Sequence, residues 1–245
     1  MAVKLDKVVP FGRSFDEYVR MFSLSETELY PLSETELYPL SDFAQKSILS
    51  VADGPASFNA EGTEYGCKIQ SVDPLYAFSG DDIRDRFYAV CDNIIEQVRL
   101  TPDDWVWRYH RSPDDLKVRR SRVTERFYQD YDLGKQQGRY TLGELPTLPY
   151  ADGAYDLGLC SHFLFLYSQQ FNRAFHLAAV LEMLRVCKEV RIFPLLGLDL
   201  VRSPHLPFVI QQLEQSGYAC CIQTVDYELQ KGGNEMLKIT PSHLP

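Results

Sequence analysis

From residue 47 onward, short apolar runs alternate with longer amphipathic ones, and this alternation constrains the fold more than any other feature. Four runs have the length and composition of buried strands: residues 48–51, 68–72, 155–160 and 190–196. Residues 170–187 instead carry apolar side chains at helical spacing. Strands separated by helices predict a doubly wound α/β fold, in which helices cover both faces of a mostly parallel sheet.

The end of the chain has a different pattern. Residues 207–216 predict a helix that stops at Gly217, and residues 218–225 and 235–240 have the composition of two strands. A short segment with two glycines, at 231–234, joins these strands. The pattern predicts an antiparallel hairpin that closes the sheet.

A long insertion, roughly residues 78–138, lies between the second strand and the next core strand. It predicts two helices, because apolar residues keep helical spacing over 83–98 and Ser112, Pro113 and Asp115 mark a second helix start. The connector between them carries both tryptophans, Trp105 and Trp107. Either these rings bury the insertion against the sheet, or they form a lid or substrate wall over a pocket.

Residues 1–46 form an N-terminal helical segment ahead of the main domain, which we assign to 47–245. Ser14 and Glu17 have the spacing of a capping box and predict a short helix. Residues 24–31 are then repeated without change at 32–39, and each copy pairs its own capping box with a final proline. This suits single helical turns, and we interpret the repeat as a tolerated surface duplication.

Composition excludes several classes of function. The chain has 245 residues and a net charge of −9, with no basic cluster longer than 119–122, so nucleic acid is not expected as the main partner. No segment approaches the ~18 apolar residues of a membrane span, and no signal peptide is visible, which predicts a cytoplasmic protein without a membrane partner. The six cysteines include no Cys-x-x-Cys pair, so reduced thiols are expected and no metal site.

Two strand ends carry candidate binding residues. The turn after the first strand combines a Gly-Pro step with small residues, so that backbone can approach a ligand, and Ser57 and Asn59 add polar side chains at a helix start. Asp73 and Pro74 follow the second strand, roughly 20 residues after the glycine turn. The Asp73 carboxylate either accepts hydrogen bonds from the two hydroxyls of an adenosine ribose or starts an Asp-Pro turn.

Four stretches resemble the successive motifs of class I S-adenosylmethionine-dependent methyltransferases, in the order of that family. They are residues 48–58 (ILSVADGPASF), 72–73, 145–162 (LPTLPYADGAYDLGLCSH) and 181–188 (LEMLRVCK). The resemblance covers roughly residues 47–240, and its most diagnostic string is LPYADGAYDL. Residues 227–237 also resemble the last hairpin of a bacterial subgroup of uncharacterised methyltransferases.

The resemblance implies a Rossmann-like sheet of seven strands with an antiparallel last strand, S-adenosylmethionine as cofactor, and methyl transfer to an unidentified, small-molecule acceptor. Carried onto this chain, it assigns these cofactor-binding residues: Asp53, Gly54, Pro55, Ala56, Ser57 and Asn59 at the methionine side, Asp73 and Pro74 at the ribose, Glu144 and Leu145 at adenine, and Ser161 after the fourth strand. His162 follows as a candidate catalytic base or as pocket wall.

The first motif departs from the family pattern. Ser50 stands where the family has an acidic residue, and Ala52 and Ala56 stand where it has glycines. These departures lower the affinity expected for the cofactor. They keep two alternatives open: a non-catalytic module that binds S-adenosylmethionine or S-adenosylhomocysteine as a sensor or scaffold, and a structural protein with an empty pocket. Motifs of P-loop, dinucleotide-binding and α/β-hydrolase proteins are absent.

Overall fold

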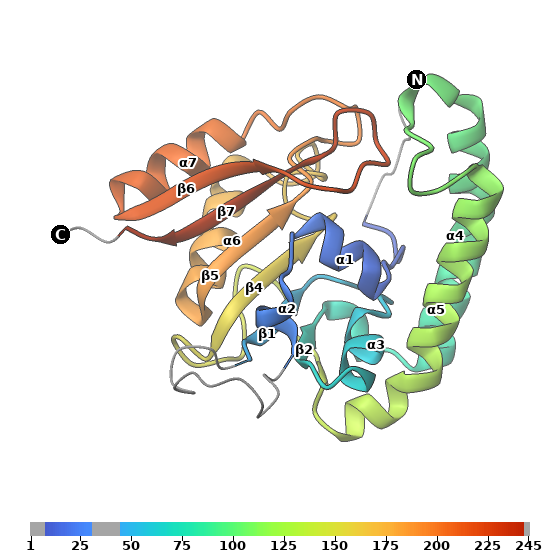
Figure 1. Ribbon diagram of the computed structural model, residues 1–245, viewed down its shortest axis with the longest axis horizontal. Coiled ribbons are helices and arrows are strands. Elements are labelled where there is room, and N and C mark those ends of the chain that lie inside the picture. The colour runs from blue at the N-terminus through green and yellow to red at the C-terminus, as the bar shows by residue number, and fades with distance from the viewer. Residues whose placement is uncertain (1–7, 31–44, 243–245) are drawn as a thin grey trace.

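The computed structural model describes residues 8–30 and 45–242. Its centre is one sheet of seven strands in the order β3-β2-β1-β4-β5-β7-β6 (Figure 1). The strands are β1 (Ser47–Val51), β2 (Lys68–Val72), β3 (Tyr140–Thr141), β4 (Tyr155–Ser161), β5 (Cys187–Phe193), β6 (Tyr218–Thr224) and β7 (Glu235–Pro241). β7 runs antiparallel to both β5 and β6, whereas the pairs among β1 to β5 are parallel. This is the Rossmann-like methyltransferase fold, and the predicted fold class is confirmed.

The predicted strand positions hold with one correction and one omission. β5 begins at Cys187 and ends at Phe193, whereas the sequence predicted 190–196. The first residues were missed because Lys188 is exposed and Glu189 is half-buried, so no apolar run marks the strand start. β3 was not predicted at all, since two residues at the sheet edge carry no periodicity.

Nine helical segments accompany the strands in the described part of the chain. They are α1 (Phe15–Met21), α2 (Glu26–Leu29), α3 (Phe58–Glu64), η1 (Pro74–Ala77), α4 (Gly80–Leu100), η2 (Pro102–Asp104), α5 (Pro113–Gln136), α6 (Arg173–Val186) and α7 (Leu206–Gln215). The capping box of Ser14 and Glu17 starts α1, as predicted. That of Ser25 and Glu28 starts α2, the single turn expected for the first repeat copy. The second copy, at 32–39, lies outside the described residues.

Alternating side chains of the strands feed two separate apolar clusters. Ile48 packs with residues of α1 and α4 on one face of the sheet. Its neighbour Leu49, together with Val51, packs with residues of α6 and α7 on the other. The sheet is thus covered on both faces, as strands buried on both sides require. None of the helices described is both long and apolar enough to cross a membrane.

The two predicted helices of the insertion are α4 and α5, which run side by side along one edge of the molecule (Figure 1). Their connector is fixed to the loop between β6 and β7, because the Val106 amide donates to the Leu229 carbonyl at 2.8 Å. Trp105 and Trp107 pack against the core, in line with the first interpretation of these rings. Trp105 also lines a cavity, and its role as a lid or substrate wall over the cofactor pocket stays a prediction. The boundary at residue 46 stays a prediction.

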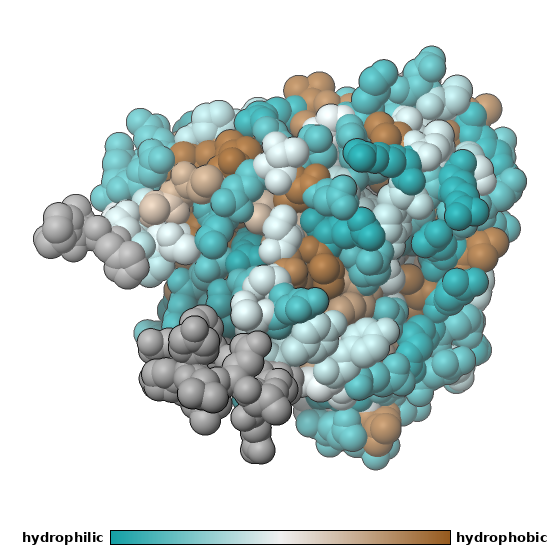
Figure 2. Space-filling view, viewed as in Figure 1, coloured by the Kyte–Doolittle hydropathy of each residue, from teal (hydrophilic) through white to brown (hydrophobic). Residues whose placement is uncertain are grey.

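On the face that Figure 2 shows, apolar side chains are scattered among polar ones and do not form one dominant patch. Large apolar side chains that remain exposed lie on several elements, including Tyr88 on α4, Leu133 on α5 and Ile222 on β6. Single exposed apolar residues are normal on a protein surface.

Candidate functional site

A cavity of about 420 Å³, here the strand-end cavity, lies at the carboxyl ends of β1, β2 and β4. Its volume falls within the roughly 300–1,000 Å³ of small-molecule sites. β1 lies between β2 and β4, where the strand order reverses, which is the usual ligand position in open α/β sheets. The structure brings six predicted residues to its lining: Asp53, Gly54, Asp73, Pro74, Ser161 and His162.

The backbone turns sharply where β1 and β4 end. Ala52 has φ 56° and His162 has φ 54°, so both adopt the left-handed conformation. A residue with a side chain loses roughly 1–2 kcal/mol there. Both residues line the strand-end cavity. Backbone strain of this kind concentrates at ligand sites, and here it directs two neighbouring loops around one cavity.

Asp53 is one of two carboxyl groups in this cavity, and it is only 7% exposed. The hydroxyls of Ser71 and Tyr76 each donate to it at 2.8 Å. Burial, together with the negative charge of Asp73, raises the pKa of Asp53 to about 7. The group is therefore partly protonated at neutral pH, and a nearby positive charge would favour its ionised form.

Asp73 is the second carboxyl group, and its two oxygens are held by backbone. The Gly54 amide donates to Oδ2 at 2.9 Å, which ties the ends of β1 and β2 together. The Leu75 amide donates to Oδ1 at 2.7 Å, which caps η1, so the predicted Asp-Pro turn is present. Burial raises the pKa of Asp73 to about 6, although these amides oppose the shift. Each oxygen keeps a further lone pair for a ligand hydroxyl.

Four predicted loop residues lie behind the cavity and are not among its lining residues: Pro55, Ala56, Ser57 and Asn59. Ala56 is part of the apolar cluster. Ser57 precedes α3, and its hydroxyl donates to Glu61. The fully buried side-chain amide of Asn59 donates from Nδ2 to the Ile69 carbonyl at 3.2 Å and so holds α3 to β2. The loop is shaped by these contacts, and direct cofactor contacts of the four residues stay predictions.

The two residues predicted at adenine, Glu144 and Leu145, are likewise not among the lining residues. Glu144 is exposed, and it forms an isolated bridge with Thr147. Leu145 is buried in the apolar cluster under α6 and α7. The structure does not bring either side chain to the strand-end cavity, and their roles stay predictions.

Tyr18 contacts Ser50, the residue that stands where the family pattern has an acid. Ser50 is fully buried, and its hydroxyl donates to the Tyr18 hydroxyl at 3.3 Å. The Tyr18 ring comes from α1, stacks on Phe58 with centroids 4.1 Å apart, and lines the strand-end cavity. The sequence placed α1 through its capping box, but helix periodicity alone did not identify which side chain meets the cavity.

Residues 8–13, here the N-terminal segment, cover both the strand-end cavity and a second cavity. The segment is fixed to the loop after β1, since the Ser57 amide donates to the Arg13 carbonyl at 3.1 Å. Gly12 makes the close approach possible, because a Cβ there would lie 2.3 Å from the Pro55 carbonyl oxygen.

Replacing Gly12 with alanine should therefore lower the free energy of unfolding by about 1–3 kcal/mol, the usual cost of overpacking. Urea denaturation followed by circular dichroism measures the change. Gly80→Ala is the matched control, because a Cβ there would lie no closer than 3.3 Å, against the Tyr128 ring. Equal stability of the two variants would show that the N-terminal segment is not tightly seated on the loop.

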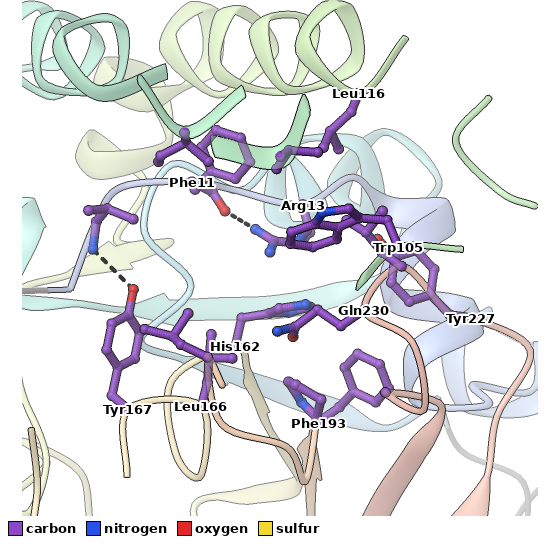
Figure 3. Close-up of a pocket in the computed structure, with 17 residues that line it drawn as sticks. Phe11, Arg13, Trp105, Leu116, His162, Leu166, Tyr167, Phe193, Tyr227 and Gln230 are labelled. Carbon is purple, nitrogen blue, oxygen red and sulfur yellow. Dashed lines mark hydrogen bonds between the residues drawn. The ribbon is translucent and has the colours of Figure 1, made fainter. Parts of the chain in front are cut away.

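The second cavity encloses about 90 Å³ and lies between the insertion, the end of β5 and the loop between β6 and β7 (Figure 3). Its walls include Trp105, Leu116, Phe193 and Tyr227. Four residues line both cavities and form a shared wall: Val9, Phe11, Arg13 and His162. The two cavities are thus neighbours, and the shared wall carries the polar groups Arg13 and His162.

His162 is a neutral side chain in this wall. Burial lowers the pKa of His162 well below its usual value, and the charges of Arg13 and Arg120 add to the effect. Its Nδ1 lies 2.9 Å from the Ser161 hydroxyl, and its ring packs edge-on against Phe193. A histidine in this environment positions or hydrogen-bonds a ligand well, but it is a weak base.

Arg13 was missed by the sequence analysis. It is 9% exposed, and it donates from Nη1 to the Phe11 carbonyl, a contact drawn in Figure 3. Its Nε is buried and has no hydrogen-bond partner among the described residues. Burial, with the charge of Arg120, lowers the pKa of Arg13 to about 10, so the group remains protonated at neutral pH. No local pattern in the sequence distinguishes this arginine from the others.

A buried ion pair holds α1 to the insertion beside this wall. Arg120 of α5 donates to both carboxylate oxygens of Glu17 at 2.7 Å, and both side chains are at most 1% exposed. The Tyr227 hydroxyl donates to Glu17 at 2.8 Å, and His110 lies 3.3 Å away. Burial opposes ionisation, but the charge of Arg120 and the His110 contact hold the pKa of Glu17 well below its usual range. We call these four residues the Glu17 cluster.

Comparisons with known proteins give one relative with substantial identity. The uncharacterised protein MJ0045 of Methanocaldococcus jannaschii is 32% identical over 238 residues, which cover 97% of this chain and 98% of that protein. No protein-family model matches the chain.

Two methyltransferases are among the solved structures that are similar to this fold. A SAM-dependent methyltransferase from Aquifex aeolicus has a TM-score of 0.42 and 13% identity, over 91% of this chain and 90% of that one. The magnesium protoporphyrin IX methyltransferase of Synechocystis PCC 6803, with bound SAM, has a TM-score of 0.40 and 10% identity, over 80% and 70%. With both TM-scores below 0.5, the assignment of the fold rests on the strand order.

Proposed function

The chain belongs to the same family as the uncharacterised protein MJ0045 of Methanocaldococcus jannaschii, and we propose that it transfers a methyl group from S-adenosylmethionine to a small-molecule acceptor. One observation carries the proposal: two cavities meet at a shared wall beside the carboxyl ends of β1, β2 and β4. A transferase must hold two reactants against each other, and two adjoining cavities of different size suit this requirement.

The strand-end cavity is the proposed cofactor site. Asp73 would accept hydrogen bonds from the ribose hydroxyls through the lone pairs that Gly54 and Leu75 leave free. Asp53 would lie near the positively charged amino or sulfonium group, and that charge would shift Asp53 toward its ionised form. The volume of about 420 Å³ is in the range of small-molecule ligands.

The second cavity is the proposed acceptor site. The cofactor supplies an activated methyl group, so the protein contributes mainly by aligning the reactants, an effect that can supply roughly 7–11 kcal/mol. We assign His162 to positioning within the shared wall, because its lowered pKa makes it a weak general base. The small volume of this cavity and the net charge of −9 favour a small molecule over nucleic acid.

A cofactor-binding module without catalysis is the second candidate. The observation that favours it is the first strand, where Ser50 replaces the expected acid and is engaged with Tyr18. Incubation with methyl-labelled S-adenosylmethionine and fractions of small molecules separates the two. Transfer of the label to any fraction supports the enzyme, whereas tight binding of S-adenosylhomocysteine without transfer supports the module.

Asp73→Ala should weaken the binding of S-adenosylhomocysteine about 10- to 100-fold, because hydrogen bonds to a charged group are worth about 1.5–3 kcal/mol. Isothermal titration calorimetry measures the dissociation constant. Asp132→Ala, at an exposed position of α5, is the control. Asp73→Asn keeps an acceptor for the capping amide and separates loss of binding from loss of η1. Unchanged affinity in folded Asp73→Ala would reject the strand-end cavity as the cofactor site.

A further inference from the structure

Most residues that line the second cavity are apolar, and the charge in its lining is positive. Among the described residues that line it, Arg13 is the one that carries a charge at neutral pH, and there is no Asp or Glu. The strand-end cavity differs, since Asp53 and Asp73 accompany Arg13 there. A ligand of the second cavity therefore meets apolar walls and a single positive charge.

Among the described residues, no carboxylate forms an ion pair with Arg13, whose Nη1 donates to the Phe11 carbonyl. Glu17 acts on Arg13 through its charge, but its oxygens are already bound by both terminal nitrogens of Arg120 and by the Tyr227 hydroxyl. An unpaired buried charge is costly, and burial accordingly lowers the pKa of Arg13 to about 10. A ligand with one negative charge would restore the balance.

The geometry of Arg13 favours a carboxylate as that ligand group. The guanidinium of Arg13 and the ring of His162 both belong to the shared wall, and both are labelled in Figure 3. The guanidinium donates from Nη1 to the Phe11 carbonyl, and its Nη2 has no hydrogen bond to a described residue, so this nitrogen remains for a ligand. A guanidinium matches a carboxylate through two parallel hydrogen bonds. A phosphate group carries −1.5 to −2 charges and would exceed the single uncompensated charge of Arg13.

We propose that the second cavity binds a small apolar carboxylate as the methyl acceptor and that Arg13 is its anchor, an inference that rests on the proposed function. The cavity of about 90 Å³ is small and partly open to solvent, so it takes up only part of the acceptor. Arg13 lies in the shared wall, which brings the anchored carboxylate next to the cofactor cavity.

This acceptor agrees with the lack of a strong base in the second cavity. A carboxylate oxygen is already anionic, so it attacks the methyl carbon without giving up a proton. The carbon–sulfur bond breaks with its electron pair on sulfur, a carbon–oxygen bond forms, and the products are a methyl ester and S-adenosylhomocysteine. His162 then needs only to donate or accept a hydrogen bond, as its lowered pKa allows.

The test is binding of butyrate and benzoate, with butyramide and benzamide as neutral counterparts, measured by calorimetry on protein saturated with S-adenosylhomocysteine. We expect the carboxylates to bind at least 10-fold more tightly than the amides. Arg13→Gln should remove this preference for carboxylates. Arg13→Lys should retain part of it, because lysine keeps the positive charge but lacks the two parallel N–H donors of the guanidinium. Arg122→Gln, an exposed position on α5, is the matched control. Equal binding of acids and amides to the natural protein would overturn the proposal.

S-adenosylhomocysteine has a carboxylate of its own, which Arg13 could bind in place of the acceptor's carboxylate. Methylthioadenosine lacks that group and therefore distinguishes the two cases. If Arg13 serves the acceptor, Arg13→Gln changes the affinity for both nucleosides less than about 3-fold, and butyrate does not compete with either. If Arg13→Gln weakens S-adenosylhomocysteine alone and butyrate displaces it, the anchor belongs to the cofactor and the proposal is overturned.

Turnover gives an independent readout. Methyl-labelled S-adenosylmethionine with a bound carboxylate should yield label that alkali releases as methanol, the behaviour of an ester. Alkali-stable label in the product would contradict the carboxylate as acceptor while leaving the methyltransferase function intact. Conversely, carboxylate binding without any binding of S-adenosylhomocysteine would reject the proposed function and not the anchor.

Discussion

Replacing Arg120 with alanine should lower the free energy of unfolding by about 3–5 kcal/mol, the cost of leaving a buried charge without its partner. In this variant Glu17 would stay buried at 1% exposure without its bidentate cation. The Tyr227 hydroxyl and His110 could not replace a positive charge, since burial lowers the pKa of His110 as well. Urea denaturation followed by circular dichroism measures the loss.

Two further variants test the cause of this loss. Replacing both partners with apolar residues, Glu17→Leu with Arg120→Met, should cost clearly less than Arg120→Ala, because no charge is left unpaired. Arg119→Ala removes the half-exposed pair with Asp115 on the same helix and should cost under about 1 kcal/mol. A loss for Arg120→Ala as small as that for Arg119→Ala would show that the Glu17 cluster does not stabilise the fold.

The Glu17 cluster also connects elements that lie at and beside the second cavity. Glu17 belongs to α1, Arg120 to α5, and Tyr227 to the loop between β6 and β7. α5 and this loop line the second cavity, through Leu116 and Tyr227 among others, and α1 directly follows the N-terminal segment that carries Arg13. Loss of the cluster should therefore disturb the second cavity before it disturbs the sheet.

Much of the fold could be predicted because it is encoded locally. Apolar runs with helices between them identified β1, β2 and β4, and the capping residues Ser14 and Ser112 fixed two helix starts. β3 was not predicted because it has only two residues, and the start of β5 was not predicted because its first residues include polar ones. Short or polar strands are defined by their neighbours in the sheet, which a local pattern does not contain.

The candidate site was predictable only where it lies at strand ends. Asp53, Asp73 and His162 directly follow strands of a parallel sheet, and such ends meet at one edge. Arg13 and Tyr18 reach the same cavity from the chain ahead of the sheet, through tertiary packing of α1. A motif comparison that begins at the first strand has no means of finding them.

Asp53→Asn should make the protein more stable at pH 8 than the natural chain while the two are equally stable near pH 4. Burial raises the pKa of Asp53 from 3.8 to about 7 in the folded state. Between these values the folded state keeps a proton that the unfolded state has released, so the unfolding free energy of the natural chain falls as pH rises, by up to ~1.4 kcal/mol per pH unit. Asparagine does not ionise, and this decline should disappear.

At pH 8 Asp53→Asn should raise the free energy of unfolding by about 2–4 kcal/mol, at ~1.4 kcal/mol per unit of pKa shift. The charge coupling with Asp73 reduces this gain, because the two groups share the shift. Urea denaturation at pH 4, 6 and 8 measures it, with exposed Asp132→Asn as control. A difference that does not depend on pH would mean that Asp53 is ionised in the folded protein throughout. The same substitution should weaken binding of S-adenosylmethionine, because the carboxylate that costs stability is the one proposed to face the positive charge of the cofactor.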